Sequence, residues 1–214
     1  MKALLYKEAR LASPLTYFFL LFSLTVLIPN YPSLLGAFFI CYGVFHTFQK
    51  GRENGEPLFT ALMPIRKSDV VRSRFLFAWL IRFTGLFLIL LFSLLRERFL
   101  SETPVYASEQ LLQPGFVLFS WMLLINSMFD LVFMTRFYRT GRKLGVPFLL
   151  FSAVSVVIVL VSEILPHIPG MEWMNDGFSS GKPLGMFLIC CVICGFVSFC
   201  SLRLSCRRFE KAEL

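Results

Sequence analysis

The sequence has 214 residues, of which 57% are apolar and 16% charged, and it contains 26 phenylalanines. Its mean hydropathy is +0.71, and a typical soluble domain has roughly 25% charged residues, so a soluble fold would lack an interior for these side chains. The net charge of +8 comes from basic residues that lie beside apolar segments, where anionic lipid and membrane topology explain them. This placement argues against nucleic-acid binding.

The first 13 residues form a weakly amphipathic segment. If they are helical, Leu4, Leu5 and Glu8 fall on one side and Lys7 on the other. A serine–proline pair follows, which fits a helix that lies in the cytoplasmic interface and then turns into the membrane. A basic tail that only fixes topology explains the segment equally well. No A-x-A-type cleavage site follows, so we expect the amino terminus to be retained.

Long uncharged segments predict the membrane spans. No Lys, Arg, Asp or Glu occurs between Leu11 and Gln49, and one crossing takes about 20 apolar residues. The turn-forming sequence at 29–32, Pro-Asn-Tyr-Pro, divides this stretch into a helical hairpin. We therefore predict an all-α integral membrane protein, a single transmembrane domain over 1–214, with six transmembrane helices at about 15–28, 33–48, 75–95, 114–134, 144–165 and 183–202.

The positions of the basic residues predict the orientation. Three lie before the first span, six between the second and third, four between the fourth and fifth, and four after the sixth. The opposite side has only Arg96, Arg98 and Lys182. Basic residues beside spans stay in the cytoplasm, so both termini of this multi-pass chain are predicted to be cytoplasmic.

The cytoplasmic segment 49–74 contains an apolar-faced helix. An acidic residue followed by proline favours a helix start, and Pro64 ends the helix, after which Ser68 is a possible cap for the third span. A helix of two turns is unstable alone, so we expect it to dock on a partner or on the membrane surface. The predicted partner-binding residues are Glu56, Leu58, Phe59, Leu62, Met63 and Arg66.

Four polar residues lie within the predicted spans: Arg82, Asn126, Asp130 and Glu163. Ionisable groups in a bilayer are costly and usually face protein or water. Arg82 and Asp130 lie at similar depths on the third and fourth spans and could pair, with Asn126 one turn away as an interhelical hydrogen-bond partner. A structural pair is a better interpretation than a substrate or proton site.

Several kinds of chemistry are absent from the sequence. It has no Gly-x-x-x-x-Gly-Lys-Ser/Thr loop for ATP, no His-Glu-x-x-His metal motif and no Gly-x-Ser-x-Gly elbow. Cys191 and Cys194 have Cys-x-x-Cys spacing, but they lie in an apolar helix without a second pair, and packing explains them better than a metal. We predict no catalytic residues, no metal and no cofactor bound by this chain.

Two segments resemble type-2 ABC transporter permeases. Residues 58–75 read Leu-Phe-Thr-Ala-Leu-Met-Pro-Ile-Arg-Lys-Ser-Asp-Val-Val-Arg-Ser-Arg-Phe, similar to the loop after the second span in short bacterial members, with Met63 where Leu is common. The opening Met-Lys-Ala-Leu-Leu-Tyr-Lys-Glu also resembles these permeases. The resemblance implies a connecting helix at the amino terminus and a coupling helix over 56–63, in a bacterial cell-membrane protein.

The resemblance further implies an exporter in which two permeases, identical or related, form the pathway. A separate ABC ATPase subunit would bind ATP and Mg and drive them. The predicted outer loops are short, so the substrate would be a peptide, lipid-like or hydrophobic molecule chosen within the membrane or from the cytoplasm. Two alternatives remain: a non-transporting scaffold or sensor that docks a cytoplasmic partner, and a lipid-modifying membrane enzyme using Arg82, Asp130 and Glu163.

Overall fold

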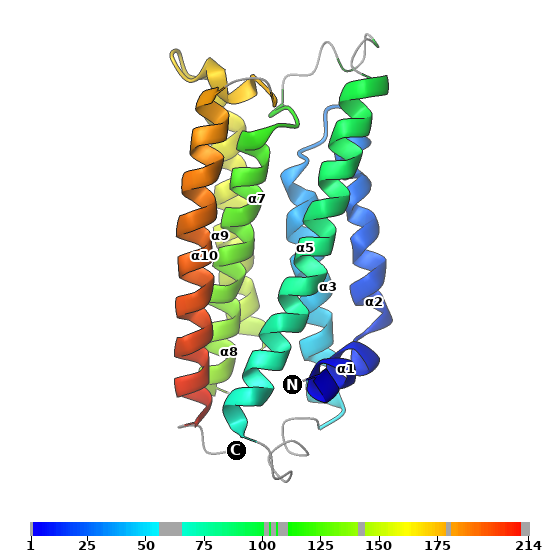
Figure 1. Cartoon of the computed structure of the whole chain (residues 1–214), viewed down its shortest axis with the longest axis vertical. Coiled ribbons are helices and arrows are strands. Elements are labelled where there is room, and N and C mark those ends of the chain that lie inside the picture. Colours follow the sequence, from blue (N-terminus) through cyan, green and yellow to red (C-terminus); the bar gives the residue numbers. More distant parts are fainter. Residues whose placement is uncertain are drawn as a thin grey trace.

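The chain folds as an elongated bundle of helices (Figure 1). The computed structural model describes residues 2–55, 66–100, 103, 106, 111–140, 144–178 and 181–210. The regular elements among these residues are all helical, which confirms the all-α prediction. The amino-terminal helix and the end of the last helix lie at the same end of the bundle (Figure 1), as an even number of crossings requires.

The amino-terminal helix lies across the lower end of the bundle. Helix α1 (Lys2–Leu11) is followed by α2 (Pro14–Phe18) and the 3-10 helix η1 (Phe19–Leu27), with a bend of 88° between α1 and the segment after it. Ser13 is extended at φ −65° and ψ 135°, and Pro14 starts the next helix. A residue before proline is disfavoured in the helical region, so this dipeptide produces the bend.

The expected hairpin is present, but its first segment is not a regular α-helix. The chain turns at residues 29–33, where Asn30 has φ of 54°, and returns as α3 (Leu34–Glu53). A nine-residue 3-10 helix is unusually long. It lies very close to α3, since a Cβ at Gly36 would come within 2.8 Å of the Phe22 carbonyl oxygen. Glycine therefore permits this close backbone approach.

Helix α5 (Lys67–Phe99) is much longer than the predicted third span. Its N-cap residue is Arg66, in an extended conformation and without a side-chain cap hydrogen bond. The expectation that Ser68 caps this helix was therefore wrong. Ser68 lies inside the first turn, because the helix begins at Lys67, two residues before the Asp69 start that a Ser68 cap would give.

The second half of the chain consists of three long helices. The first comprises α7 (Phe116–Met128), the π-helix η2 (Phe129–Met134) and α8 (Thr135–Thr140). It is followed by α9 (Gly145–Ile164), the short 3-10 helices η3 (Leu165–His167) and η4 (Glu172–Asn175), and α10 (Gly181–Glu210). The π-helix interrupts the predicted fourth span, and no pattern in the sequence indicated it.

In the described part of the chain, four helical segments are long and apolar enough to cross a membrane: Lys67–Phe99, Phe116–Arg139, Gly145–His167 and Gly181–Glu210. A fifth is counted if α1 and Pro14–Leu27 form one broken span. Helix α3 lies beside them but ends in the polar sequence Gln-Lys-Gly-Arg-Glu. Six spans therefore stay a prediction, and the coupling-helix residues 56–63 lie outside the described residues.

Aromatic packing joins the two halves of the bundle. Elements α2, α3 and α5 lie on one side of Figure 1, and α7, α8, α9 and α10 lie on the other. The ring centroids of Phe45 on α3 and Phe148 on α9 are 4.1 Å apart and stacked. Phe45 also meets Phe133 of η2 edge-on at 5.7 Å. Helix α3 is thus one element through which the halves pack, and α5 is the other, since it packs against α10.

Candidate functional site

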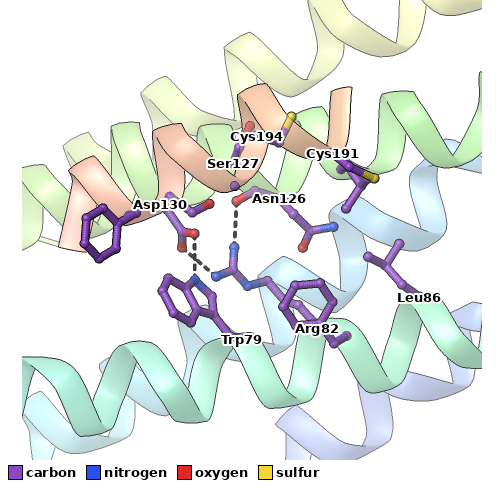
Figure 2. A pocket seen from close by; sticks show the side chains of 13 residues that line it. Trp79, Arg82, Leu86, Asn126, Ser127, Asp130, Cys191 and Cys194 are labelled. Carbon is purple, nitrogen blue, oxygen red and sulfur yellow. Dashed lines mark hydrogen bonds and ion pairs between the residues drawn. The ribbon is translucent and has the colours of Figure 1, made fainter. Parts of the chain in front are cut away.

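A buried ion pair connects α5 to η2. The Arg82 Nη2 donates to Asp130 Oδ1 at 2.5 Å, and the two side chains are 3% and 1% exposed. Trp79 Nε1 donates to the other carboxylate oxygen at 2.9 Å (Figure 2). Both oxygens of Asp130 therefore accept hydrogen bonds, and the charges compensate each other in a dry environment.

Backbone carbonyls complete the surroundings of Arg82. Its Nη1 donates to the carbonyl oxygen of Asn126 at 2.6 Å, and its Nε donates to that of Ala78 at 3.2 Å. The side chain of Asn126 accepts a weak hydrogen bond from the Cys41 thiol, with 3.6 Å between Sγ and Oδ1. Thus Arg82, Asn126 and Asp130 come together as their depths suggested, although Asn126 contacts arginine through its backbone.

The π-helix positions Asp130. The Thr135 hydroxyl donates to the Asp130 carbonyl five residues earlier, at 2.9 Å. Such π-bulges insert an extra residue in a helix turn and are frequent at functional sites. Because Asp130 lies at the start of η2, the altered turn sets the direction of the carboxylate toward α5.

A cavity of about 470 Å³ lies beside the ion pair, between α5, α7 with η2, and α10 (Figure 2). Most of its wall is apolar, and the polar groups gather around the guanidinium and the carboxylate. Cys191 and Cys194, which the sequence suggested only as packing residues, line it from α10. The full lining is Trp79, Arg82, Phe83, Leu86, Leu123, Asn126, Ser127, Asp130, Cys191, Cys194, Gly195, Ser198 and Phe199.

Glu163 lies apart from this group. Its Oε2 accepts a hydrogen bond at 2.9 Å from the backbone N–H of Leu112, near the end of the bundle opposite to α1. Glu163 therefore fixes the segment before α7 rather than approaching Arg82 or Asp130. Among the described residues, no group of three or more His, Cys, Asp or Glu side chains could hold a metal ion.

A second buried ion pair joins α1 to α5 at the lower end. Arg74 Nε and Glu8 Oε2 are 3.3 Å apart, with side chains 10% and 3% exposed. Lys7 also lies 3.5 Å from the other oxygen of Glu8. Arg66, the one predicted partner-binding residue that the structure describes, is exposed at the start of the same α5. The other five lie outside the described residues.

Comparison with known proteins identifies the family of this bundle. A family model described as ABC-2 family transporter protein matches residues 3–210. The chain belongs to this family. The search of curated proteins gave no match, and the search of solved structures gave none either.

The chain is therefore the permease subunit of an ABC transporter of type 2, a multi-pass membrane protein whose own role is transport rather than catalysis. For this permease, the polar group at Arg82 lies inside a membrane-spanning bundle, where an ionisable pair is tolerated because both partners are satisfied. The separation of Glu163 from that pair removes the geometric basis for the lipid-modifying enzyme.

Proposed function

We propose that this permease is half of an ABC exporter, in which two permeases form the pathway and a separate ATPase subunit supplies the energy. The observation that carries the proposal is the family match over residues 3–210, together with a sequence that contains no phosphate-binding loop of its own. The ATPase would bind ATP and Mg, and this chain would bind neither.

The lower end of the bundle is the proposed ATPase side, and it faces the cytoplasm of a bacterial cell. Basic side chains at the start of α1 and α5 and at the end of α10 gather there: Lys2, Lys67, Arg207 and Arg208. Such an excess favours the cytoplasmic side. The Glu8–Arg74 pair links α1 to α5 at this end, so a displacement of one helix by the ATPase would also move the other.

A second permease is the proposed neighbour of the outer helices. Several apolar side chains of α9 and α10 are more than half exposed, among them Leu160, Ile189, Val192 and Phe196. In a membrane, lipid or another permease can cover such a surface. Pairing with an identical or related subunit would form a pathway for a peptide, lipid-like or hydrophobic substrate.

Affinity co-purification in mild detergent tests the ATPase partner. We expect an ATPase to accompany the native chain and to be lost with Leu58→Asp or Phe59→Asp, because a carboxylate would disrupt an apolar docking face. Asn54→Asp is the matched control, since Asn54 is exposed at the end of α3, just before the docking segment. This control should retain the ATPase.

Size-exclusion chromatography of each variant shows that the chain is still folded. If no ATPase accompanies the folded native chain, the ATP-driven exporter is refuted. Capture of a cytoplasmic protein without ATPase activity would instead support the scaffold or sensor. Equal loss in the Asn54→Asp control would show that the docking face is not where we place it.

A further inference from the structure

We propose that the cavity between α5 and α10 binds one neutral amphiphile, whose apolar body fills the cavity and whose hydrogen-bonding head group lies at Arg82. The proposal names a substrate class for the permease and, in that respect, rests on the proposed function. The binding itself depends only on this chain. Its site is lined by residues of one subunit.

The size and wall of the cavity fit such a molecule. Its volume of about 470 Å³ falls in the range of about 300–1,000 Å³ that is typical of small-molecule sites. Phe83, Leu86, Leu123 and Phe199 provide apolar walls. A mostly apolar cavity with a few convergent polar groups favours a ligand with the same division of polarity.

The polar end favours a neutral head group. Arg82 and Asp130 compensate each other's charge, so a charged ligand would bring an uncompensated charge into a dry site. Within the described part of the chain, three of the five N–H groups of Arg82 donate hydrogen bonds to protein oxygens. The Cys41 thiol also lies against the guanidinium, so at most one Arg82 donor is left for a hydroxyl, ester or amide oxygen of the ligand.

The cavity is accessible from the membrane side of the bundle. Phe83 on α5 and Phe199 on α10 both line it, and they are 60% and 46% exposed. At the lower end, the Cys206 thiol of α10 contacts the Ser68 carbonyl of α5 at 3.9 Å, whereas the upper ends of the two helices lie well apart (Figure 1). An amphiphile dissolved in the bilayer can thus reach the cavity laterally, between the two helices.

Two glycines on α10 provide a matched test. A Cβ at Gly195, which lines the cavity, would meet no atom within 4 Å, and the same is true of Gly185, which does not line it. Gly195→Leu should therefore fill the cavity without disturbing the backbone. Gly185→Leu makes the same chemical change on the same helix outside the cavity.

The probe is a long-chain alcohol with a photoreactive diazirine, added to the purified chain in detergent without any ATPase. We expect saturable labelling at cavity residues such as Trp79 and Leu86, located by mass spectrometry. Labelling should fall about tenfold in Gly195→Leu, because the leucine side chain occupies part of the volume that the probe fills. It should be unchanged in Gly185→Leu.

Further labelling and competition experiments identify the head group and the source of the ligand. Diazirine probes with a carboxylate or an ammonium head should label more weakly than the alcohol. Competition by the unlabelled alcohol, but not by a two-chain phospholipid, would indicate a free amphiphile, and competition by both would indicate that membrane lipid also occupies the site; either result supports the binding site. In Arg82→Met/Asp130→Leu, preference for the alcohol over an alkane probe should disappear.

Three results would overturn the proposal: labelling that the unlabelled alcohol does not reduce, equal labelling of the two glycine variants, or the absence of cavity labelling in a chain that is dimeric through this face. The last result would assign the cavity to the second permease. Failure of ATPase co-purification would leave the labelling unaffected, so the two proposals fail separately.

Discussion

Removing the carboxylate of Asp130 is the most direct perturbation of the bundle. Asp130→Ala deprives two donors of their acceptor, the Arg82 Nη2 at 2.5 Å and the Trp79 Nε1 at 2.9 Å. It also leaves a guanidinium that is 3% exposed without its counter-charge. Breaking a buried pair in this way costs about 3–5 kcal/mol, and we expect that loss in the free energy of unfolding.

The assay is unfolding of the purified chain in mixed detergent micelles, followed by circular dichroism as sodium dodecyl sulfate is added. Arg82→Met/Asp130→Leu should recover most of the loss, because replacing both charges by apolar groups is often neutral or stabilising by about 1–4 kcal/mol. Glu97→Ala is the control, since Glu97 is exposed on the same α5 and should cost less than about 0.5 kcal/mol. The reasoning is refuted if Asp130→Ala is as stable as the control, or if the double variant is no more stable than the single one.

Two further changes test other contacts. Gly115→Ala should lower the free energy of unfolding by about 1–3 kcal/mol, because its Cβ would come within 2.6 Å of Gly177 backbone atoms. Gly185→Ala is the control and should cost nothing, since the space around its Cβ is open. Equal melting temperatures of the two variants would contradict the close approach of Gly115 to Gly177. Glu8→Gln should loosen the packing of α1 against α5, since it removes the charge opposite Arg74 at a cost of about 1–3 kcal/mol. Limited trypsin digestion should then cut within α1 faster. An unchanged cleavage rate would contradict the role of the Glu8–Arg74 pair in holding α1 to α5.

The sequence predicted the features that depend on composition and spacing. The uncharged stretch divided by Pro29 and Pro32 was expected to form a hairpin, and the structure has a turn there between η1 and α3. The pairing of Arg82 with Asp130 was suggested as an open possibility by their similar depths, and the structure shows the contact. The roles of the predicted partner-binding residues stay predictions.

Features that depend on the packing of distant segments could not be predicted. The 3-10 geometry of η1 accompanies its close approach to Gly36, and the start of α5 at Lys67 overrides the local capping preference of Ser68. The cavity exists because α5 and α10 diverge away from their contact at Cys206. Hydrophobic spacing predicts that two helices are buried, but not how far apart they lie.

The π-helix at Phe129–Met134 also determines which side chains face the core below it. A π-turn accommodates one more residue than an α-turn, and one residue corresponds to a rotation of about 100° around the helix axis. With that extra residue, Phe133, Phe137 and Tyr138 are all buried, and Phe137 meets Phe48 of α3 at 5.1 Å. Deleting a single residue from this segment would turn α8 by about a quarter of a circle and point Phe137 away from Phe48 of α3. The segment should therefore tolerate substitutions far better than a change of length.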